Sequence, residues 1–214
     1  MSGRRALAAL AATGMIALIA TACGSSAPQA FHPAGKASAA PNPSASLANF
    51  PFPPDIHIDF QSALPADPQQ AAAVTTDRDF QLAFYYAQYT QGKDRRYEQY
   101  LAPGTTPLLI EVQSNVTPYA TDHKSIRGTL RLYDTTVQPV QGAPQALSVT
   151  QCVDDSKLPD VDARSGKVIP GSPRPSAYYI LESDTFKPLG SGRWGLAAIA
   201  ITVYPQGNAK ECKP

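Results

Sequence analysis

Two acidic residues and a histidine alternate in a short segment of the chain, at Asp55, His57 and Asp59. Side chains two residues apart in a strand point to the same face, so these three could hold a metal ion together. The apolar residues Ile56 and Ile58 alternate with them and would face the core of such a strand. We therefore expect a short edge strand with its acidic face in water, no metal site and no cofactor.

A second group of acids has the spacing of a loose calcium loop, formed by Asp154, Asp155, Asp160 and Asp162. The segment lacks the glycine at the sharp turn and the terminal bidentate glutamate that EF-hand loops use. A solvated acidic loop is therefore the better interpretation.

Other motifs that carry chemistry are missing from the sequence. It contains no GxSxG, no HExxH, no P-loop, no dinucleotide-binding fingerprint and no paired CxxC. The 214 residues include 18 Lys and Arg against 17 Asp and Glu, a net charge of +1. Nucleic-acid binding needs a concentrated basic surface, so we expect no nucleic-acid partner.

The elements that would position a site begin with an aromatic helix. Thr76 followed by Asp79 predicts a helix start, and Gly92 predicts an end near Gln91. The helix carries two apolar stripes, which are Phe80, Ala83, Phe84 and Ala87, and Leu82, Tyr85, Tyr86 and Tyr89. Such a wide apolar arc must be covered on more than one side, and its tyrosine hydroxyls suit the wall of a cavity.

Strands dominate the rest of the chain. A second short helix is expected over 94–101, whereas 108–112 fits either a short strand or a short helix. Alternating and β-branched runs predict four long strands, over 128–140, 146–153, 176–184 and 196–204. Helices followed by an antiparallel meander predict an α+β fold.

The N-terminus resembles the signal sequence of a bacterial lipoprotein. Arg4 and Arg5 precede an uncharged run from Ala6 to Ala20, and the small residue Ala22 stands directly before Cys23. This arrangement is similar to a lipobox, which implies removal of residues 1–22 and acylation (a palmitate-type lipid) of Cys23. The alternative is an ordinary secretory signal followed by a chance cysteine. We expect the chain to be anchored by lipid at the extracytoplasmic face of the cell membrane.

Residues 23–54 are typical of a tether. Apart from the lipidated cysteine, they are rich in Pro, Ala and Ser and carry one charge, at Lys36. Such a composition cannot bury a core, so we expect disorder. Phe50 and Phe52 are the aromatic residues of this segment that can pack onto the domain, which we expect to span residues 55–214.

Two cysteines remain after lipidation, Cys152 and Cys212. An even number of cysteines in an exported protein predicts a disulfide. The alternative is two free thiols, one of them catalytic, but His32, His57 and His123 stand in no matching pattern.

The folded part resembles the NTF2-like (cystatin-like, cone-shaped) superfamily and, within it, secreted lipoproteins of high-GC Gram-positive bacteria. The resemblance rests on several segments of residues 75–214, which are Phe84 to Leu101, Cys152 to Ser156, Ser165 to Lys167, Tyr178-Tyr179, Gly192 to Trp194, and Cys212. It implies an α+β cone in which N-terminal helices pack inside a curved antiparallel sheet and leave a pocket at the mouth.

Isomerases of that superfamily use a pocket aspartate and a tyrosine, which makes Asp134 and Tyr86 the weak catalytic candidates. Asp134 shares a predicted strand face with Leu130 and Leu132, and a carboxyl group in an apolar pocket has a raised pKa. The stronger interpretation places Asp134 in water, beyond the buried part of the strand. Glu182 is a weaker candidate of the same kind.

The expected pocket residues are Phe84, Tyr85, Tyr89 and Trp194, although Trp194 also fits a simple core anchor. We expect a non-enzymatic, surface-tethered module that binds a small apolar ligand or an envelope protein. The alternatives are an exported isomerase- or dehydratase-like enzyme that uses an Asp/Tyr pair, and a structural protein whose cone is filled.

Overall fold

The computed structural model describes residues 50–172, 178–205 and 212. The chain divides into two units, Met1–Ala37 and Ser38–Pro214, and all described residues lie in the second. The predicted signal sequence, the predicted lipidation site Cys23 and most of the predicted tether therefore lie outside the described residues.

The described unit is an α+β structure, as the sequence predicts. Its elements in chain order are β1 (Ile56–Phe60), α1 (Pro68–Tyr89), the 3₁₀ helix η2 (Arg96–Tyr100), α2 (Thr106–Thr121), β2 (Lys124–Ile126), β3 (Gly128–Val140), β4 (Ala143–Lys157), β5 (Asp160–Asp162), β6 (Tyr178–Gly190) and β7 (Arg193–Pro205). Segment 108–112, which the sequence left open, belongs to helix α2.

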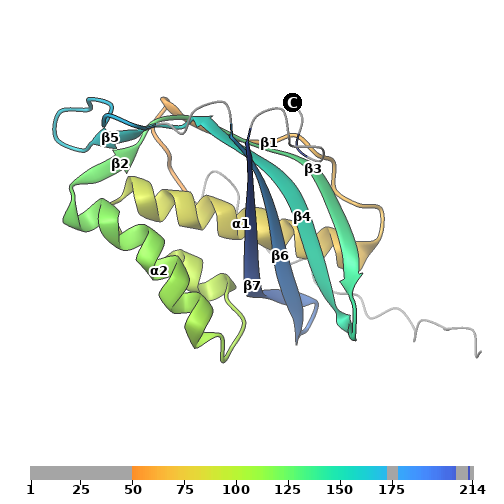
Figure 1. Ribbon diagram of the computed structural model, residues 1–214. Helices are drawn as coiled ribbons and strands as arrows, with labels where there is room; N and C mark the ends of the chain where they lie inside the picture. Colours follow the sequence, from red (N-terminus) through yellow and green to blue (C-terminus); the bar gives the residue numbers. More distant parts are fainter. Residues whose placement is uncertain (1–49, 173–177, 206–211, 213–214) are drawn as a thin grey trace, which may run out of the picture. The chain divides into compact units, whose positions relative to one another are not determined.

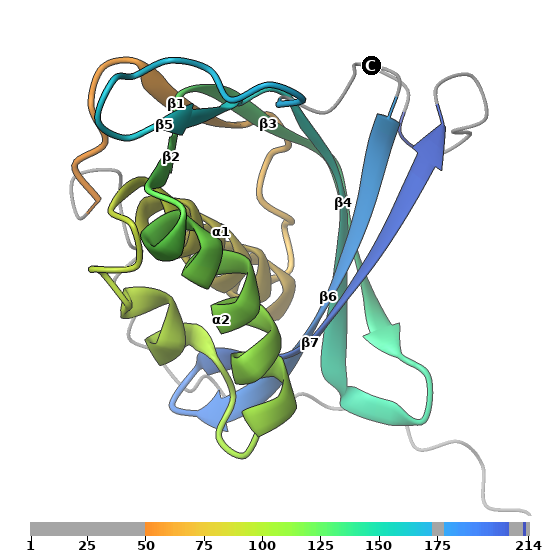
Figure 2. The same ribbon diagram turned by 60° about the vertical axis from the view of Figure 1, so that its left-hand side comes forward.

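The main sheet has the strand order β1-β3-β4-β6-β7, and β2 pairs with β5 in a small second sheet. Strands β3, β4, β6 and β7 are antiparallel neighbours, but β1 runs parallel to β3. The sheet is therefore mixed, which corrects the expected antiparallel sheet: the helices between β1 and β3 form a crossover that lets the two strands run the same way. The long strands bend over α1 and α2, which lie on the same side of the sheet (Figures 1 and 2).

Helix α1 starts earlier than the sequence predicts. Its N-cap is Asp67, whose Oδ1 accepts hydrogen bonds from the backbone N–H groups of Gln69 and Gln70 at 2.9 Å, and Pro68 occupies the first turn. Thr76 lies inside the helix and donates its hydroxyl to the carbonyl of Ala72. The Thr76 start was wrong because a Thr-x-x-Asp pattern also occurs within helices. The difference matters because the observed start places Asp77 in the middle of the helix, not at its first turn.

The core lies between the helices and the concave face of the sheet. In α2, Leu108, Val112 and Val116 are buried at helical spacing, and Ile56 and Ile58 of β1 are buried while His57 and Asp59 are exposed. That alternation matches the expected edge strand with a solvated acidic face. None of the described helices is long and apolar enough to cross a membrane.

The opposite face of the sheet carries the two cysteines. Cys152 of β4 is bonded to Cys212, and both pack with Tyr133 and Leu181 in a small separate cluster. Because strand residues alternate between faces, the neighbouring Gln151 points to the concave side while Cys152 points away from it. The structure thus places the two cysteines in a disulfide, as the sequence predicts.

Candidate functional site

Helix α1 presents a buried polar stripe to the concave face of the sheet. Asp77, Gln81, Phe84 and Gln88 follow one another at intervals of four, three and four residues, so they share one side of the helix. Asp77 and Gln81 are 0% and 2% exposed, which is unusual for a carboxyl and an amide at the middle of a helix. Such groups need polar partners from the sheet that covers them.

Strands β4 and β6 supply those partners. In β6, Glu182 and Asp184 alternate with solvent-side residues and share the buried face with Ile180 and Phe186. The pairing register places Gln151 of β4 directly beside Glu182. Two strands thus bring two carboxyl groups and one amide against the polar stripe of α1.

The carboxyl groups of Asp77, Glu182 and Asp184, which we call the carboxyl triad, each place one oxygen within 4.8 Å of the others. Side-chain amides hold two of its oxygens, which we call the outer oxygens: Gln151 donates Nε2–H to Asp77 Oδ2 at 3.0 Å, and Gln81 donates Nε2–H to Glu182 Oε1. Asp77 Oδ1, Asp184 Oδ1 and Asp184 Oδ2, which we call the inner oxygens, are buried and receive no hydrogen bond from outside the triad. The triad therefore lacks a positive group at its centre.

Burial sets the proton affinity of the triad. It raises the pKa of Asp77 from 3.8 to about 7, against the hydrogen bonds that favour the ionised form. The pKa values of Glu182 and Asp184 are raised too, first by burial and, for Asp184, by the neighbouring charges of Glu182 and Asp77. Three carboxylates this close cannot all ionise in a dry site, so without a cation the triad retains protons near neutral pH.

A cavity of about 350 Å³ opens beside the triad. Gln81 and Glu182 line it, so Glu182 belongs to both the cavity and the triad, whereas Asp77 and Asp184 do not line it. Its aromatic lining residues are Phe80, Phe84, Tyr85 and Tyr119, and its acidic ones are Glu111, Asp155, Asp160 and Glu182. None of the described residues that line it is Lys, Arg or His.

Two acids of the predicted acidic loop line the cavity, a position that the sequence did not predict. Asp155 and Asp160 line the cavity, and Tyr119 donates its hydroxyl to Asp160 Oδ1 at 2.8 Å. Asp154 instead pairs with Arg131, and Asp162 accepts the backbone N–H groups of Arg164 and Ser165. The four acids are thus dispersed, and they do not form a calcium loop.

Of the predicted pocket residues, Phe84 and Tyr85 line the cavity, and Tyr89 and Trp194 do not. Trp194 is 8% exposed and packs in the main core, which corrects its assignment to the pocket. Tyr89 lies against Phe52, at a ring-centroid distance of 6.5 Å. Tyr85 and Tyr89 are four residues apart, but only Tyr85 reaches the cavity.

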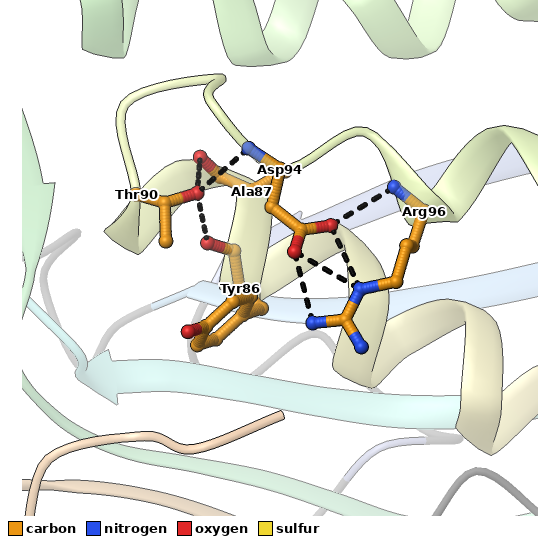
Figure 3. A network of polar contacts seen from close by, with 5 residues as sticks. All are labelled: Tyr86, Ala87, Thr90, Asp94 and Arg96. Atoms are coloured by element: carbon orange, nitrogen blue, oxygen red, sulfur yellow. Dashed lines mark hydrogen bonds and ion pairs between the residues drawn. The ribbon is translucent and has the colours of Figure 1, made fainter. Parts of the chain in front are cut away.

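Tyr86, a weak catalytic candidate, packs against the N-terminal segment and does not line the cavity. Its ring lies 5.7 Å from the ring of Phe50 and 5.2 Å from that of Phe52. Asp94 holds Arg96 by hydrogen bonds and an ion pair (Figure 3). The guanidinium of Arg96 stands over the rings of Phe50 and Tyr86. Phe50 is 1% exposed, so this end of the predicted tether is part of the folded unit.

Asp134, the other weak candidate, is exposed and lies where the β3–β4 register shifts between Tyr133 and Thr136. Its φ angle of 51° breaks the alternation that would have aimed it at the concave face with Leu130 and Leu132. The expected solvated position is therefore the observed one, and the Asp134–Tyr86 pair does not form.

Sequence reasoning missed Asp77, Gln81, Gln151 and Asp184, and it gave Glu182 too little weight. One signal was available: Glu182 and Asp184 alternate with Ile180 and Phe186, which places two acids on a buried strand face. The corresponding signal for Asp77 was hidden by the wrong start of α1.

Comparisons with known proteins identify no family for this chain. No family model matches the chain, and no curated protein matches it. One solved structure with some likeness is described as "Sac3N peptide bound to Mex67:Mtr2". The two chains are 14% identical over 71% of this chain and 76% of that one, with a TM-score of 0.16, too low to support an argument.

Proposed function

We propose that this protein is an exported, lipid-anchored binding module of NTF2-like cone architecture that holds a small organic cation in its cavity. The observation that carries the proposal is the lining of the cavity: four aromatic rings, four carboxyl groups and no basic side chain among the described residues. Its volume of about 350 Å³ lies within the usual range for small-molecule sites.

The lining favours a positively charged ligand on two physical grounds. Aromatic faces attract cations and gain most when the cation loses its water, as it does in a lined cavity. Carboxyl groups of one sign in a concave, low-dielectric site raise the local concentration of cations. Glu182 is the member of the triad that lines the cavity, and Gln81 donates a hydrogen bond to one of its oxygens. Its carboxyl group is therefore placed to pair with the ligand.

Binding of simple benzyl probes tests this proposal. We expect the full chain to bind benzyltrimethylammonium and benzylamine more tightly than benzyl alcohol, and to reject benzoate, when titrated calorimetrically at pH 7.5. Glu182→Gln should weaken binding of the two cations about tenfold, because it removes the carboxylate that faces the cavity. The control Asp134→Asn changes an exposed acid and should bind like the wild type. Equal binding of benzoate and the cations would refute the charge preference.

The membrane attachment proposed for the chain rests on the sequence Ala22-Cys23 after an uncharged run. We expect mass spectrometry of the native protein to find an acylated N-terminal cysteine at position 23, and Cys23→Ala to move the protein from the membrane fraction to the soluble fraction. A Cys23→Ala variant that remained in the membrane fraction would exclude the lipid as the anchor.

One observation favours a second function, proton-transfer catalysis. Glu182 reaches the cavity, and burial raises its pKa, which suits a general acid or base near neutral pH. In that case a pool of small metabolites incubated with the protein would be converted catalytically, and Glu182→Gln would abolish conversion while Asp134→Asn would not. A ligand that is bound and recovered unchanged favours the binding module.

A further inference from the structure

We propose that the carboxyl triad of Asp77, Glu182 and Asp184 is a binding site for one divalent cation of the oxygen-preferring class, with Ca²⁺ as the preferred ion. The site is distinct from the proposed ligand cavity, because Asp77 and Asp184 do not line that cavity. Only Glu182 is common to both.

The first argument is the set of unpaired oxygens. Asp77 Oδ1 and both oxygens of Asp184 are buried, their residues are 0% exposed, and no group outside the triad donates to them. A buried carboxylate oxygen without a donor is costly, and buried charges in proteins are usually paired or coordinate a metal ion. The amides of Gln81 and Gln151 hold the outer oxygens of Glu182 and Asp77, which leaves the inner oxygens free for an ion.

The second argument is the spacing of the three carboxyl groups. One oxygen of each lies within 4.8 Å of the others. Three atoms that close leave a point no more than about 2.8 Å from each of them, which is close to the 2.3–2.6 Å of Ca²⁺–oxygen bonds. Mg²⁺ requires about 2.0–2.1 Å and near-octahedral geometry, so it would require a larger contraction of the site. Three carboxylate ligands and no nitrogen or sulfur donor also disfavour zinc.

The third argument is charge and access. The basic side chain whose charge acts on Asp77 is that of its neighbour Arg78, but the guanidinium donates to the carbonyl of Ser62 and lies 5.2 Å from the ring of Phe60. It therefore offers no hydrogen bond to the triad. Glu182 lines the cavity, so an ion can enter through a space that carries three further carboxyl groups.

Calorimetric titration of the chelator-stripped full chain tests the proposal, with CaCl2 or MgCl2 as the probe at pH 7.5. We expect one Ca²⁺ per chain, binding at least tenfold tighter than Mg²⁺, and a melting temperature that rises by several degrees in 1 mM CaCl2. Terbium, which replaces Ca²⁺ in oxygen sites, should bind with the same stoichiometry and be displaced by Ca²⁺.

Asp184→Asn is the informative variant, because Asp184 is outside the ligand cavity and an amide of the same shape should preserve the fold. We expect it to lower Ca²⁺ affinity at least tenfold while benzyltrimethylammonium binding stays within twofold of the wild type. The matched control is Asp154→Asn, an acid on the same sheet that pairs with Arg131 and should leave Ca²⁺ binding unchanged. No 1:1 Ca²⁺ binding by the wild type, tighter binding of Mg²⁺, or unchanged Ca²⁺ affinity in Asp184→Asn would each overturn the proposal.

Discussion

In a chelating buffer at pH 8, Asp184→Asn is expected to be more stable than the wild type, and the difference should shrink as the pH falls toward 4. The amide of the variant is uncharged and has two N–H donors, so it can donate hydrogen bonds to the carboxyl oxygens of Asp77 and Glu182, as a protonated Asp184 would. Without a metal ion at pH 8, the folded wild type must either bury ionised carboxylates or keep protons that the unfolded chain has released to water. Both lower the free energy of unfolding.

The pH dependence has a definite sign. The pKa of Asp77 is about 7 in the folded protein against 3.8 ordinarily, so between these values the folded state holds a proton that the unfolded state has lost. The free energy of unfolding of the wild type therefore falls as the pH rises through this window, by on the order of 4 kcal/mol from Asp77 alone. Hydrogen bonds lower the pKa values of Asp94 and Asp162. The stability that these two groups contribute is lost only as the pH falls below their ordinary pKa of 3.8.

Urea unfolding at intervals from pH 4.5 to 8 measures this effect. The wild-type free energy of unfolding should decline across the range, and Asp184→Asn should give a shallower slope and a higher value at pH 8. Asp134→Asn, an exposed acid exchanged for the same amide, should follow the wild type. A wild-type curve that is flat or rises between pH 5 and 7 would show that the triad does not carry buried protons.

The existence of β1 and of the four long strands was predictable because local sequence determines them, although β4, β6 and β7 have other bounds than predicted and β2 and β5 were not predicted. Strand β3 has the predicted bounds, since its alternation runs between Gly128 and the turn at Gly142. The short strand at Ile56–Phe60 was predicted for the same reason, as its buried and exposed residues alternate strictly. The disulfide followed from the number of cysteines and from the expected compartment, which together do not depend on the fold.

The carboxyl triad could not be predicted in full because it depends on which helix faces which strand. Two of its acids are adjacent by strand alternation, but Asp77 joins them across 105 residues through the packing of α1 on β6. The real helix start, Asp67-Pro68, is an N-cap followed by a proline and was visible in the sequence. Had α1 been started there, Asp77 and Gln81 would have stood on the buried side of a 22-residue helix.

The catalytic candidate Asp134 shows the limit of alternation as a guide. Counting by twos from Leu130 and Leu132 places it on the concave face, but a bulge interrupts the count at Asp134 itself. A bulge depends on the register of two strands, and nothing in the residues Asp134-Thr135-Thr136 signals it. The strand acid that does line the cavity is Glu182, from a strand whose pairing register is uninterrupted there.

Removal of the disulfide should cause a loss of stability of similar size. The bond between Cys152 and Cys212 closes a loop with a sequence separation of 60. In the chain-entropy model such a loop contributes about 4 kcal/mol by restricting the unfolded chain. We expect the double variant Cys152→Ala/Cys212→Ala to lose about 2–4 kcal/mol of unfolding free energy, measured by urea denaturation at pH 5.

The control for the packing around this bond is Tyr133→Phe. The hydroxyl of Tyr133 donates to the carbonyl of Cys212 at 3.3 Å, so its removal should cost about 1 kcal/mol or less while the loop stays closed. Wild-type protein unfolded in a reducing agent should have an unfolding free energy close to that of the double variant, because both then lack the covalent link. An unchanged denaturation midpoint in the double variant would mean that the sheet alone fixes Cys212. Asp77, whose pKa is about 7 in the folded protein, holds its proton at pH 5. A loss seen there therefore comes from the cross-link on the far face of β4, where Cys152 and Gln151 point to opposite sides.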